Sequence, residues 1–331
     1  MTFVSAPALP GEGIAAPVSV VVEAVVAETP VIRMYVLAAR DGSALPDHEP
    51  GAHIDVIVPD LPVRQYSLID TGAHPGRYVI AVLRDPASRG GSQGIHDRLA
   101  AGIELAVSAP RNHFRLGGRA ERHILVAGGI GVTPILSMAR KLQAEGTPFE
   151  LHYCCRSRDQ AAFLPMLAEA PFAQAVHLHF DDEGPAQRFS PRDLLAGAGT
   201  AEVYMCGPTG FMDWVRAEAE AAGFPAAQVH VEHFAPAAAP VAGGAFQIVV
   251  ASTGEVVDVP EDKSALIALE EAGYDIPMSC EQGICGSCVT RILEGEALHN
   301  DSILDEHQRE VEKLFTPCCS RARTARLVVD L

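Results

Sequence analysis

Four of the eight cysteines have a spacing that can hold an iron–sulfur cluster. Cys280, Cys285 and Cys288 follow the pattern Cys-x4-Cys-x2-Cys, and Cys318 comes 29 intervening residues later. Two irons require four thiolates around a compact cluster. A tight loop can supply three of them, and a distant segment supplies the fourth. This spacing is typical of plant-type 2Fe–2S proteins and predicts such a cluster here.

A structural zinc site is the main alternative for the same cysteines. Zinc sites usually pair cysteines as two CxxC knuckles, and here one half would be a lone cysteine, so the cluster is favoured. Gly283 and Gly286 would allow positive φ angles in the loop and bring backbone N–H groups near the sulfurs. Cys319 is a rival for the fourth ligand, whereas Cys154 and Cys155 are interpreted as ordinary buried thiols.

Two short motifs in the first third of the chain could bind a flavin. Arg64-Gln65-Tyr66-Ser67 combines an arginine for a phosphate, an aromatic ring for a flavin face and a hydroxyl for the ring edge. Ser88-Arg89-Gly90-Gly91-Ser92 precedes an expected helical turn, Gly94–Leu99, and could hold a phosphate at its start. Each is weak alone, because a surface strand and a flexible loop would look the same.

Two glycine-containing motifs further along could bind a nicotinamide nucleotide. Gly128–Pro134 joins a strand to a helix, and its small residues would let a pyrophosphate approach the helix start. It is not the GxGxxG fingerprint, which disfavours an ordinary Rossmann dehydrogenase. Cys206-Gly207-Pro208 ends a later strand and could line the nicotinamide pocket, although Gly-Pro also occurs at simple helix starts.

The arrangement of expected elements changes twice along the chain. Short β-branched runs between turns, from about 18 to 116, predict an antiparallel barrel or sandwich. From about 120, strands alternate with helical segments, which predicts a doubly wound parallel sheet. The Pro, Ala and Gly of 235–245 have linker composition, and two short strands, a helix and the cysteine loop follow. The expected elements are 18–26, 31–37, 53–58, 77–83, 123–127, 150–155, 175–180, 202–206, 211–222, 228–231, 246–251, 255–259, 264–271 and 326–330.

Composition excludes several classes of function. The formal net charge of −17 over 331 residues disfavours nucleic acid as a partner. The first residues lack the pattern of a signal peptide, and no run of about 18 apolar residues predicts a membrane helix. We therefore expect a cytoplasmic protein with no membrane partner.

Together these motifs resemble the phthalate dioxygenase reductase and vanillate O-demethylase reductase family, from about residue 18 to 331. The members are single-chain flavin, NAD and ferredoxin reductases of Rieske-type oxygenases. The motifs occur in the family's order: Arg64–Ser67, Arg89–Ser92, Gly128–Pro134, Cys206–Pro208, Glu232–Phe234 and the cluster cysteines.

The resemblance implies a multidomain fold. After a loose segment, 1–17, it implies an antiparallel β-barrel flavin domain over 18–117 and an α/β doubly wound parallel-sheet nicotinamide domain over 118–234. A linker, 235–245, leads to an α+β β-grasp ferredoxin domain over 246–331.

The resemblance also implies roles for single residues and selects FMN as the flavin. Ser67, Cys206 and Phe234 would lie at the reacting centre, with Phe234 covering a flavin face until nicotinamide displaces it. Cys318, which precedes Cys-Ser-Arg as in the family, would be the fourth cluster ligand. The other cofactor-binding residues would be Arg64, Gln65, Tyr66, Arg84, Arg89, Gly90, Gly91, Ser92, Gly129, Gly131, Thr133, Pro134, Arg156, Gly207 and Pro208.

The sequence departs from the family pattern mainly at the position expected to distinguish NADH from NADPH. The family generally prefers NADH, and we expect NADH here. However, Arg156-Ser157-Arg158 ends the second strand of the nicotinamide domain, where two arginines could accept the 2′-phosphate of NADPH.

These expectations define an NAD(P)H-dependent iron–sulfur flavoprotein oxidoreductase, the reductase component of a Rieske-type aromatic oxygenase. A hydride carries two electrons and the cluster accepts one at a time, so a flavin is needed between them. No general base is required, and the histidines are interpreted as packing or surface residues. The alternatives are the same electron chain serving a haem monooxygenase, or a non-catalytic redox or zinc-stabilised interaction module.

The acidic charge is concentrated at the end expected to meet the acceptor. Residues 246–331 contain 16 Asp and Glu against 7 Lys and Arg, which gives −9 of the chain's −17. We therefore expect this end to bind a basic face of a terminal oxygenase, in a manner that weakens with salt.

Overall fold

The computed structural model describes residues 17–86, 90–117, 120–184, 187–196, 200–234, 243–274, 276–277, 283, 286–301, 303–304 and 306–331. The chain divides into two compact units. One unit extends to Gly207 and includes Trp214–Val231, and the other comprises Pro208–Asp213 and the residues from Glu232 onwards. The expected N-terminal segment, apart from residue 17, and residues 235–242 of the expected linker lie outside the described residues.

The first unit begins with an antiparallel β-barrel of seven strands, in the order β4-β3-β6-β1-β2-β5 with β7 paired to β3. Ile69, just past β4, donates its N–H to the Val79 carbonyl of β5 at 2.8 Å, so the two ends of the sheet meet. A barrel, rather than a sandwich, is therefore what the β-branched runs form. Its elements are β1 (Val18–Ala27), β2 (Ile32–Ala39), β3 (Ala52–Ile57), β4 (Arg64–Ser67), β5 (Tyr78–Leu83), α1 (Gly91–Arg98), β6 (Glu104–Val107) and β7 (Arg111–Asn112).

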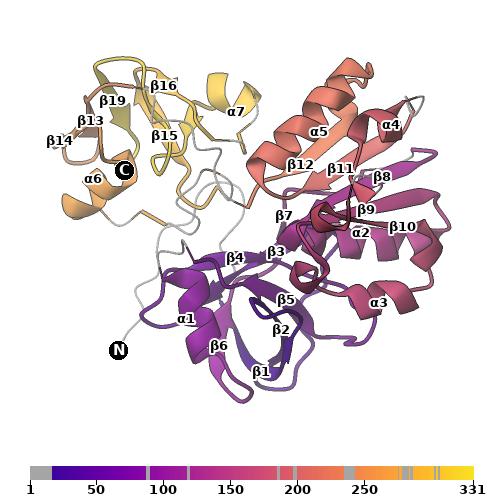
Figure 1. Ribbon diagram of the computed structural model, residues 1–331. Helices are drawn as coiled ribbons and strands as arrows, with labels where there is room; N and C mark the ends of the chain where they lie inside the picture. The colour runs from indigo at the N-terminus through magenta and orange to yellow at the C-terminus, as the bar shows by residue number, and fades with distance from the viewer. Residues whose placement is uncertain are drawn as a thin grey trace. The chain divides into compact units, whose positions relative to one another are not determined.

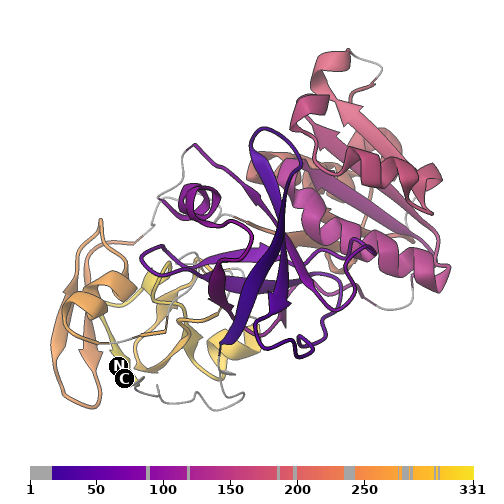
Figure 2. The ribbon, with the colours of Figure 1, turned by 90° about the horizontal axis from the view of Figure 1, so that it is seen from below.

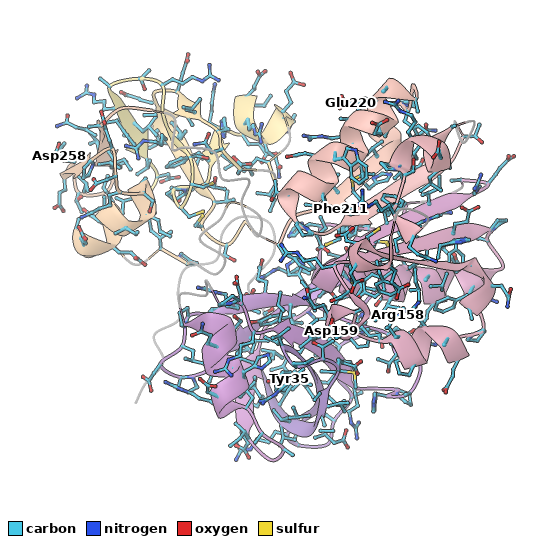
Figure 3. All side chains as sticks on the ribbon, viewed as in Figure 1. Tyr35, Arg158, Asp159, Phe211, Glu220 and Asp258 are labelled. Carbon is cyan, nitrogen blue, oxygen red and sulfur yellow. The ribbon has the colours of Figure 1, made fainter. Side chains whose placement is uncertain are left out.

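The interior of the barrel is filled by alternate side chains of its strands. Tyr35 and Leu37 of β2 are fully buried, as is Ile54 of β3, and Figure 3 shows Tyr35 within the barrel. Helix α1 contributes Ile95 to the same core, and Figure 2 shows this helix nearly end-on beside the strands.

After the barrel comes a five-stranded sheet in the order β10-β9-β8-β11-β12, most of which belongs to the first unit. Strands β8 to β11 run parallel, and Figure 1 shows α2 and α3 on one side of the sheet and α4 and α5 on the other. This is the doubly wound arrangement expected from the alternating pattern. Its elements are β8 (His123–Gly128), α2 (Val132–Glu145), β9 (Phe149–Cys155), α3 (Leu164–Glu169), β10 (Val176–Phe180), α4 (Pro191–Leu195), β11 (Glu202–Cys206), α5 (Thr209–Ala221) and β12 (Val229–Glu232), with short 3-10 turns at Gly129–Gly131 and Arg158–Gln160.

Barrel and parallel sheet share one hydrophobic core. Met34 and Val79 of the barrel pack in the same cluster as Ile135 and Leu136 of α2. A polar link crosses this core as well, because Phe163 donates its N–H to the Glu28 carboxylate at 2.9 Å. The two parts of the first unit are thereby held together by apolar burial and by hydrogen bonds.

The second unit contains a mixed five-stranded sheet in the order β14-β13-β19-β15-β17 and a separate pair, β16-β18. Strand β13 runs parallel to β19, and the buried Leu266 and Leu269 of α6 belong to the same core as β13, as in a β-grasp fold. Its elements are β13 (Phe246–Val250), β14 (Val256–Val259), α6 (Ala265–Glu271), β15 (Thr290–Glu294), β16 (Ala297–Leu298), α7 (Glu306–Glu310), β17 (Leu314–Phe315), β18 (Arg321–Ala322) and β19 (Arg326–Val329). None of the helices in the described part of the chain could span a membrane.

Candidate functional site

Strand β4 holds the residues expected to bind the flavin. It pairs antiparallel with β3, with Ser67 opposite His53 and Gln65 opposite Asp55. The Ser67 hydroxyl is buried and has no hydrogen-bond partner among the described residues. A buried hydroxyl normally has a partner, so Ser67 fits a ligand that brings one. Burial raises the pKa of Tyr66, so its hydroxyl stays protonated and able to donate.

Gln65 precedes Tyr66 on β4, and its side-chain amide forms a hydrogen bond within the protein. It donates to the Asp55 carboxylate at 3.0 Å, and Arg111 also binds that carboxylate at 2.6 Å. Gln65 therefore helps to fix β4 on β3. This supporting network was not predicted from the sequence.

The start of α1 brings together the groups expected to hold the flavin's phosphate. Gly90 has a φ of 94° and precedes the helix, whose first turn is capped by no described side chain. A Cβ on Gly91 would lie 2.8 Å from the Arg64 side chain, so this arginine passes directly over the helix start. Backbone N–H groups and a guanidinium at one place can bind an anion.

Two other predicted phosphate ligands make contacts elsewhere in the protein, and a third is not described. Arg84 binds the Asp97 carboxylate at 3.0 Å on the exposed side of α1. The Ser92 hydroxyl accepts the Asp85 N–H at 3.2 Å. Arg89 lies outside the described residues.

The nucleotide loop lies where the strand order of the parallel sheet reverses. Strands β8 and β11 are neighbours, and Cys206 is opposite Ala127. A Cβ on Gly131 would lie 2.2 Å from the Cys206 carbonyl oxygen, and one on Gly207 would lie 2.9 Å from Gly128 Cα. These glycines are therefore required by the close approach of two backbones. In open α/β sheets such a switch point is where nucleotides bind.

The start of α2 places the remaining loop residues. Thr133 and Pro134 are buried in its first turn, and the Thr133 hydroxyl donates to the Ile130 carbonyl at 3.1 Å. Cys206 is fully buried at the end of β11. Phe234, two residues past β12, is 38% exposed.

A single serine connects the flavin strand to the nucleotide helix. Ser137 of α2 donates to the Leu68 carbonyl at 2.9 Å and accepts the Asp70 N–H at 2.8 Å. Leu68 directly follows β4, so the flavin strand is fixed to the helix that begins at the nucleotide loop. This link was also missed by sequence reasoning.

Of the two arginines past β9, Arg158 is already paired with a carboxylate. Arg158 binds the Glu183 carboxylate and lies 4.5 Å from the centre of the Phe180 ring. Ser157 donates to Asp159, which lies beside Arg158 in Figure 3. Ser157 and Arg158 are thus both paired with carboxylates, whereas Arg156 is exposed. The pairing of Ser157 and Arg158 disfavours their use for a 2′-phosphate.

Two of the four predicted cluster cysteines are described, and they lie together. Cys288 and Cys318 are buried, and the neighbouring Cys288 and Cys319 thiols raise the pKa of the Cys318 thiol. Cys280 and Cys285 lie outside the described residues. Converging buried thiols are donors that fit an iron–sulfur cluster.

The two loop glycines have the conformation expected of them. Gly283 and Gly286 have φ angles of 70° and 74°. A Cβ on Gly283 would lie 2.4 Å from the Cys319 sulfur, so Cys319 packs against Gly283. Its sulfur is also 3.2 Å from the Thr316 hydroxyl.

Comparison with known proteins agrees with these features. Residues 125–217 match the model of the oxidoreductase NAD-binding domain, and residues 248–323 match that of the 2Fe-2S iron-sulfur cluster binding domain. The chain is 46% identical to the vanillate O-demethylase oxidoreductase of Pseudomonas sp. strain HR199, across 88% of this chain and 92% of the relative. The chain belongs to this family of oxygenase reductases.

The solved structures extend the family assignment to the whole fold. Phthalate dioxygenase reductase, described as modular and transferring electrons from pyridine nucleotides to [2Fe-2S], matches with a TM-score of 0.73 and 36% identity, over 96% of this chain and 98% of that one. A type IV self-sufficient cytochrome P450 monooxygenase matches with a TM-score of 0.82 and 36% identity. This chain spans 41% of that longer protein. The family member described here is thus an NAD-dependent iron–sulfur oxidoreductase.

Proposed function

We propose that this protein is the reductase component of a Rieske-type aromatic oxygenase and passes electrons from NADH through FMN to a 2Fe–2S cluster. The cofactors supply hydride acceptance and one-electron transfer, and the protein positions them. The observation that carries the proposal is the Ser137 link, because it fixes the flavin strand to the nucleotide helix at 2.9 Å and 2.8 Å.

The residues of the flavin and nicotinamide motifs have distinct tasks in this proposal. Arg64 and the start of α1 bind the FMN phosphate, and Tyr66 and Ser67 contact the flavin ring. Gly129, whose Cβ position is open, leaves room for the nucleotide pyrophosphate, and Gly131 lets the loop lie against the backbone of Cys206 and Gly207. Phe234 covers the flavin until nicotinamide arrives.

The second unit supplies the one-electron site. Cys288 and Cys318 are two cluster ligands, and Cys280 and Cys285 complete the set. Cys319 is not a ligand in this proposal, because its sulfur lies under Gly283 and beside Thr316.

NADH is the proposed electron donor. The Arg158 guanidinium is bound by Glu183, and Ser157 by Asp159, so neither group is set to receive a 2′-phosphate.

The partner is proposed to be a terminal oxygenase of the cytoplasm. The test is turnover: the purified reductase with NADH should support product formation by a Rieske-type oxygenase, and should not do so when the oxygenase is omitted. No product with any of a panel of Rieske-type oxygenases would reject this class of partner. Full ferricyanide reduction in the same experiment would show that electron transfer within the reductase is intact.

A haem monooxygenase is the second candidate partner. The likeness to part of a self-sufficient cytochrome P450, with a TM-score of 0.82, favours it specifically. Reduction of a purified P450 under carbon monoxide, measured as the ferrous–CO absorption band, would distinguish the two. Faster reduction of the P450 than of any Rieske-type oxygenase would select the haem partner.

A further inference from the structure

Three histidines and a glutamate gather on the edge of the parallel sheet. Glu150 and His152 lie on one face of β9, and His177 and His179 lie on β10, the edge strand in Figure 1. The register puts His177 directly opposite His152. The rings of His177 and His179 both stack on His152, with centroids 4.7 Å and 5.3 Å away. The electron-transfer reaction uses none of these residues.

His152 and His179 link the Glu150 carboxylate to the Gln187 carbonyl oxygen through a chain of polar contacts. The Glu150 carboxylate Oε2 lies 3.3 Å from His152 Nε2, and His152 Nδ1 lies 3.0 Å from His179 Nε2. His179 Nδ1 lies 3.2 Å from the Gln187 carbonyl oxygen. The chain therefore has three contacts, and each needs a hydrogen or a cation between its two atoms.

Two neutral imidazoles supply only two hydrogens for these three contacts. In the tautomer in which His179 donates to the Gln187 carbonyl and His152 donates to His179, the lone pair on His152 Nε2 faces the Glu150 carboxylate. A cation between these two atoms would receive a lone pair from each of them.

We propose that Glu150, His152 and His177 form a binding site for a divalent transition-metal ion of the zinc class. Their ligand atoms all lie within 4.8 Å of one another. Two ligands held about 2.0–2.1 Å from a tetrahedral zinc are about 3.3 Å apart, which matches the separation of His152 and Glu150. Two imidazoles and one carboxylate, with a fourth position for water, are a ligand set that zinc accepts.

Polar neighbours can orient two of the proposed metal ligands, as is usual in metal sites. In the metal-bound tautomer His152 Nδ1 would donate to His179 Nε2, 3.0 Å away, which would hold the ring with Nε2 towards the metal. Arg122 binds the other carboxylate oxygen, Oε1, at 2.5 Å and leaves Oε2 facing His152. His177 is exposed, so its ring can turn about the Cα–Cβ bond to complete the set.

Zinc titration of the oxidised holoenzyme tests this site. Adventitious metal is first removed by dialysis against a weak chelator, and iron and zinc are then counted by mass spectrometry. We expect one zinc per chain in addition to the cluster iron. His177→Gln and Glu150→Gln should each weaken zinc binding at least about tenfold without changing the visible spectrum.

His307→Gln is the matched control, because His307 is also an exposed histidine 3.3 Å from one carboxylate, that of Glu312. It should bind zinc like the wild-type protein. No zinc binding by the wild-type protein would show that a third proton, not a metal, completes the chain. Equal zinc binding by His177→Gln, or an equal loss in His307→Gln, would place the zinc elsewhere, and each result would overturn the proposal.

Discussion

At the scale of single residues, the proposed reaction depends on polar groups whose partners are cofactors. The Ser67 hydroxyl is buried without a partner among the described residues, although most buried hydroxyls have one. The motif in the sequence located this residue, but only the structure separates it from Gln65, whose amide is bound to Asp55.

Replacing Ser67 by alanine should slow hydride transfer more than it weakens flavin binding. One hydrogen bond to the reacting edge of the flavin is worth about 1 kcal/mol, and its loss should lower the rate about five- to tenfold. Anaerobic stopped-flow absorption after NADH mixing measures this rate. Ser19→Ala, an exposed serine on β1, is the control and should react like wild type. An unchanged rate in Ser67→Ala would remove Ser67 from the reacting centre.

Glu183→Gln should raise the use of NADPH relative to NADH. Glu183 binds the Arg158 guanidinium, and removing that charge releases the arginine for a 2′-phosphate. The ratio of kcat/KM for NADPH over NADH should rise several-fold. Glu169→Gln, at the exposed end of α3, should leave the ratio unchanged. If both variants keep the wild-type ratio, Glu183 does not contribute to the choice of nucleotide.

At the scale of elements, the strands with clear alternation were predicted well. Strands β1, β2, β3 and β5 start and end within two residues of the predicted limits, because β-branched runs between turns leave few alternatives. Strands β7, β16, β17 and β18 have two residues each and were not predicted, since two residues carry no periodicity.

Contacts between residues of different elements were the part of the site that could not be predicted from the sequence. Ser137 and Leu68 are 69 positions apart, and nothing in either motif indicates that they meet. The histidine cluster was interpreted as packing or surface residues for the same reason. Its members come together only through the register of β9 and β10.

Ser137→Ala should both destabilise the first unit and slow NADH oxidation. The change leaves the Leu68 carbonyl and the Asp70 N–H without their partner, which costs about 1–3 kcal/mol. Urea unfolding followed by far-UV circular dichroism measures the free energy, and ferricyanide reduction measures the rate. Lys141→Ala, on the exposed side of α2, should change neither. Wild-type stability and rate in Ser137→Ala would show that the link is dispensable.

At the scale of the whole molecule, the charge is uneven. The ferredoxin end, residues 246–331, carries 16 acidic against 7 basic residues and therefore −9 of the total −17. Such a surface attracts a partner with a basic face and speeds association at low salt.

Reduction of the protein acceptor should therefore slow as salt is added. Between about 50 and 500 mM NaCl the second-order rate constant should fall by about tenfold or more, because screening shortens the range of the attraction. Reduction of ferricyanide, a small anion, is the control and should not slow. A protein acceptor reduced equally fast at both salt concentrations would exclude electrostatic docking.

The central claim is that one chain carries electrons from NADH through a flavin to a 2Fe–2S cluster. The most direct measurement is a visible absorption spectrum of the purified holoenzyme before and after anaerobic NADH addition, followed by low-temperature electron paramagnetic resonance. The account predicts a flavin band with a broad iron–sulfur shoulder, both bleached by NADH, and the signal of a reduced 2Fe–2S cluster. A protein that stays colourless and inert after reconstitution with FMN, iron and sulfide would contradict it.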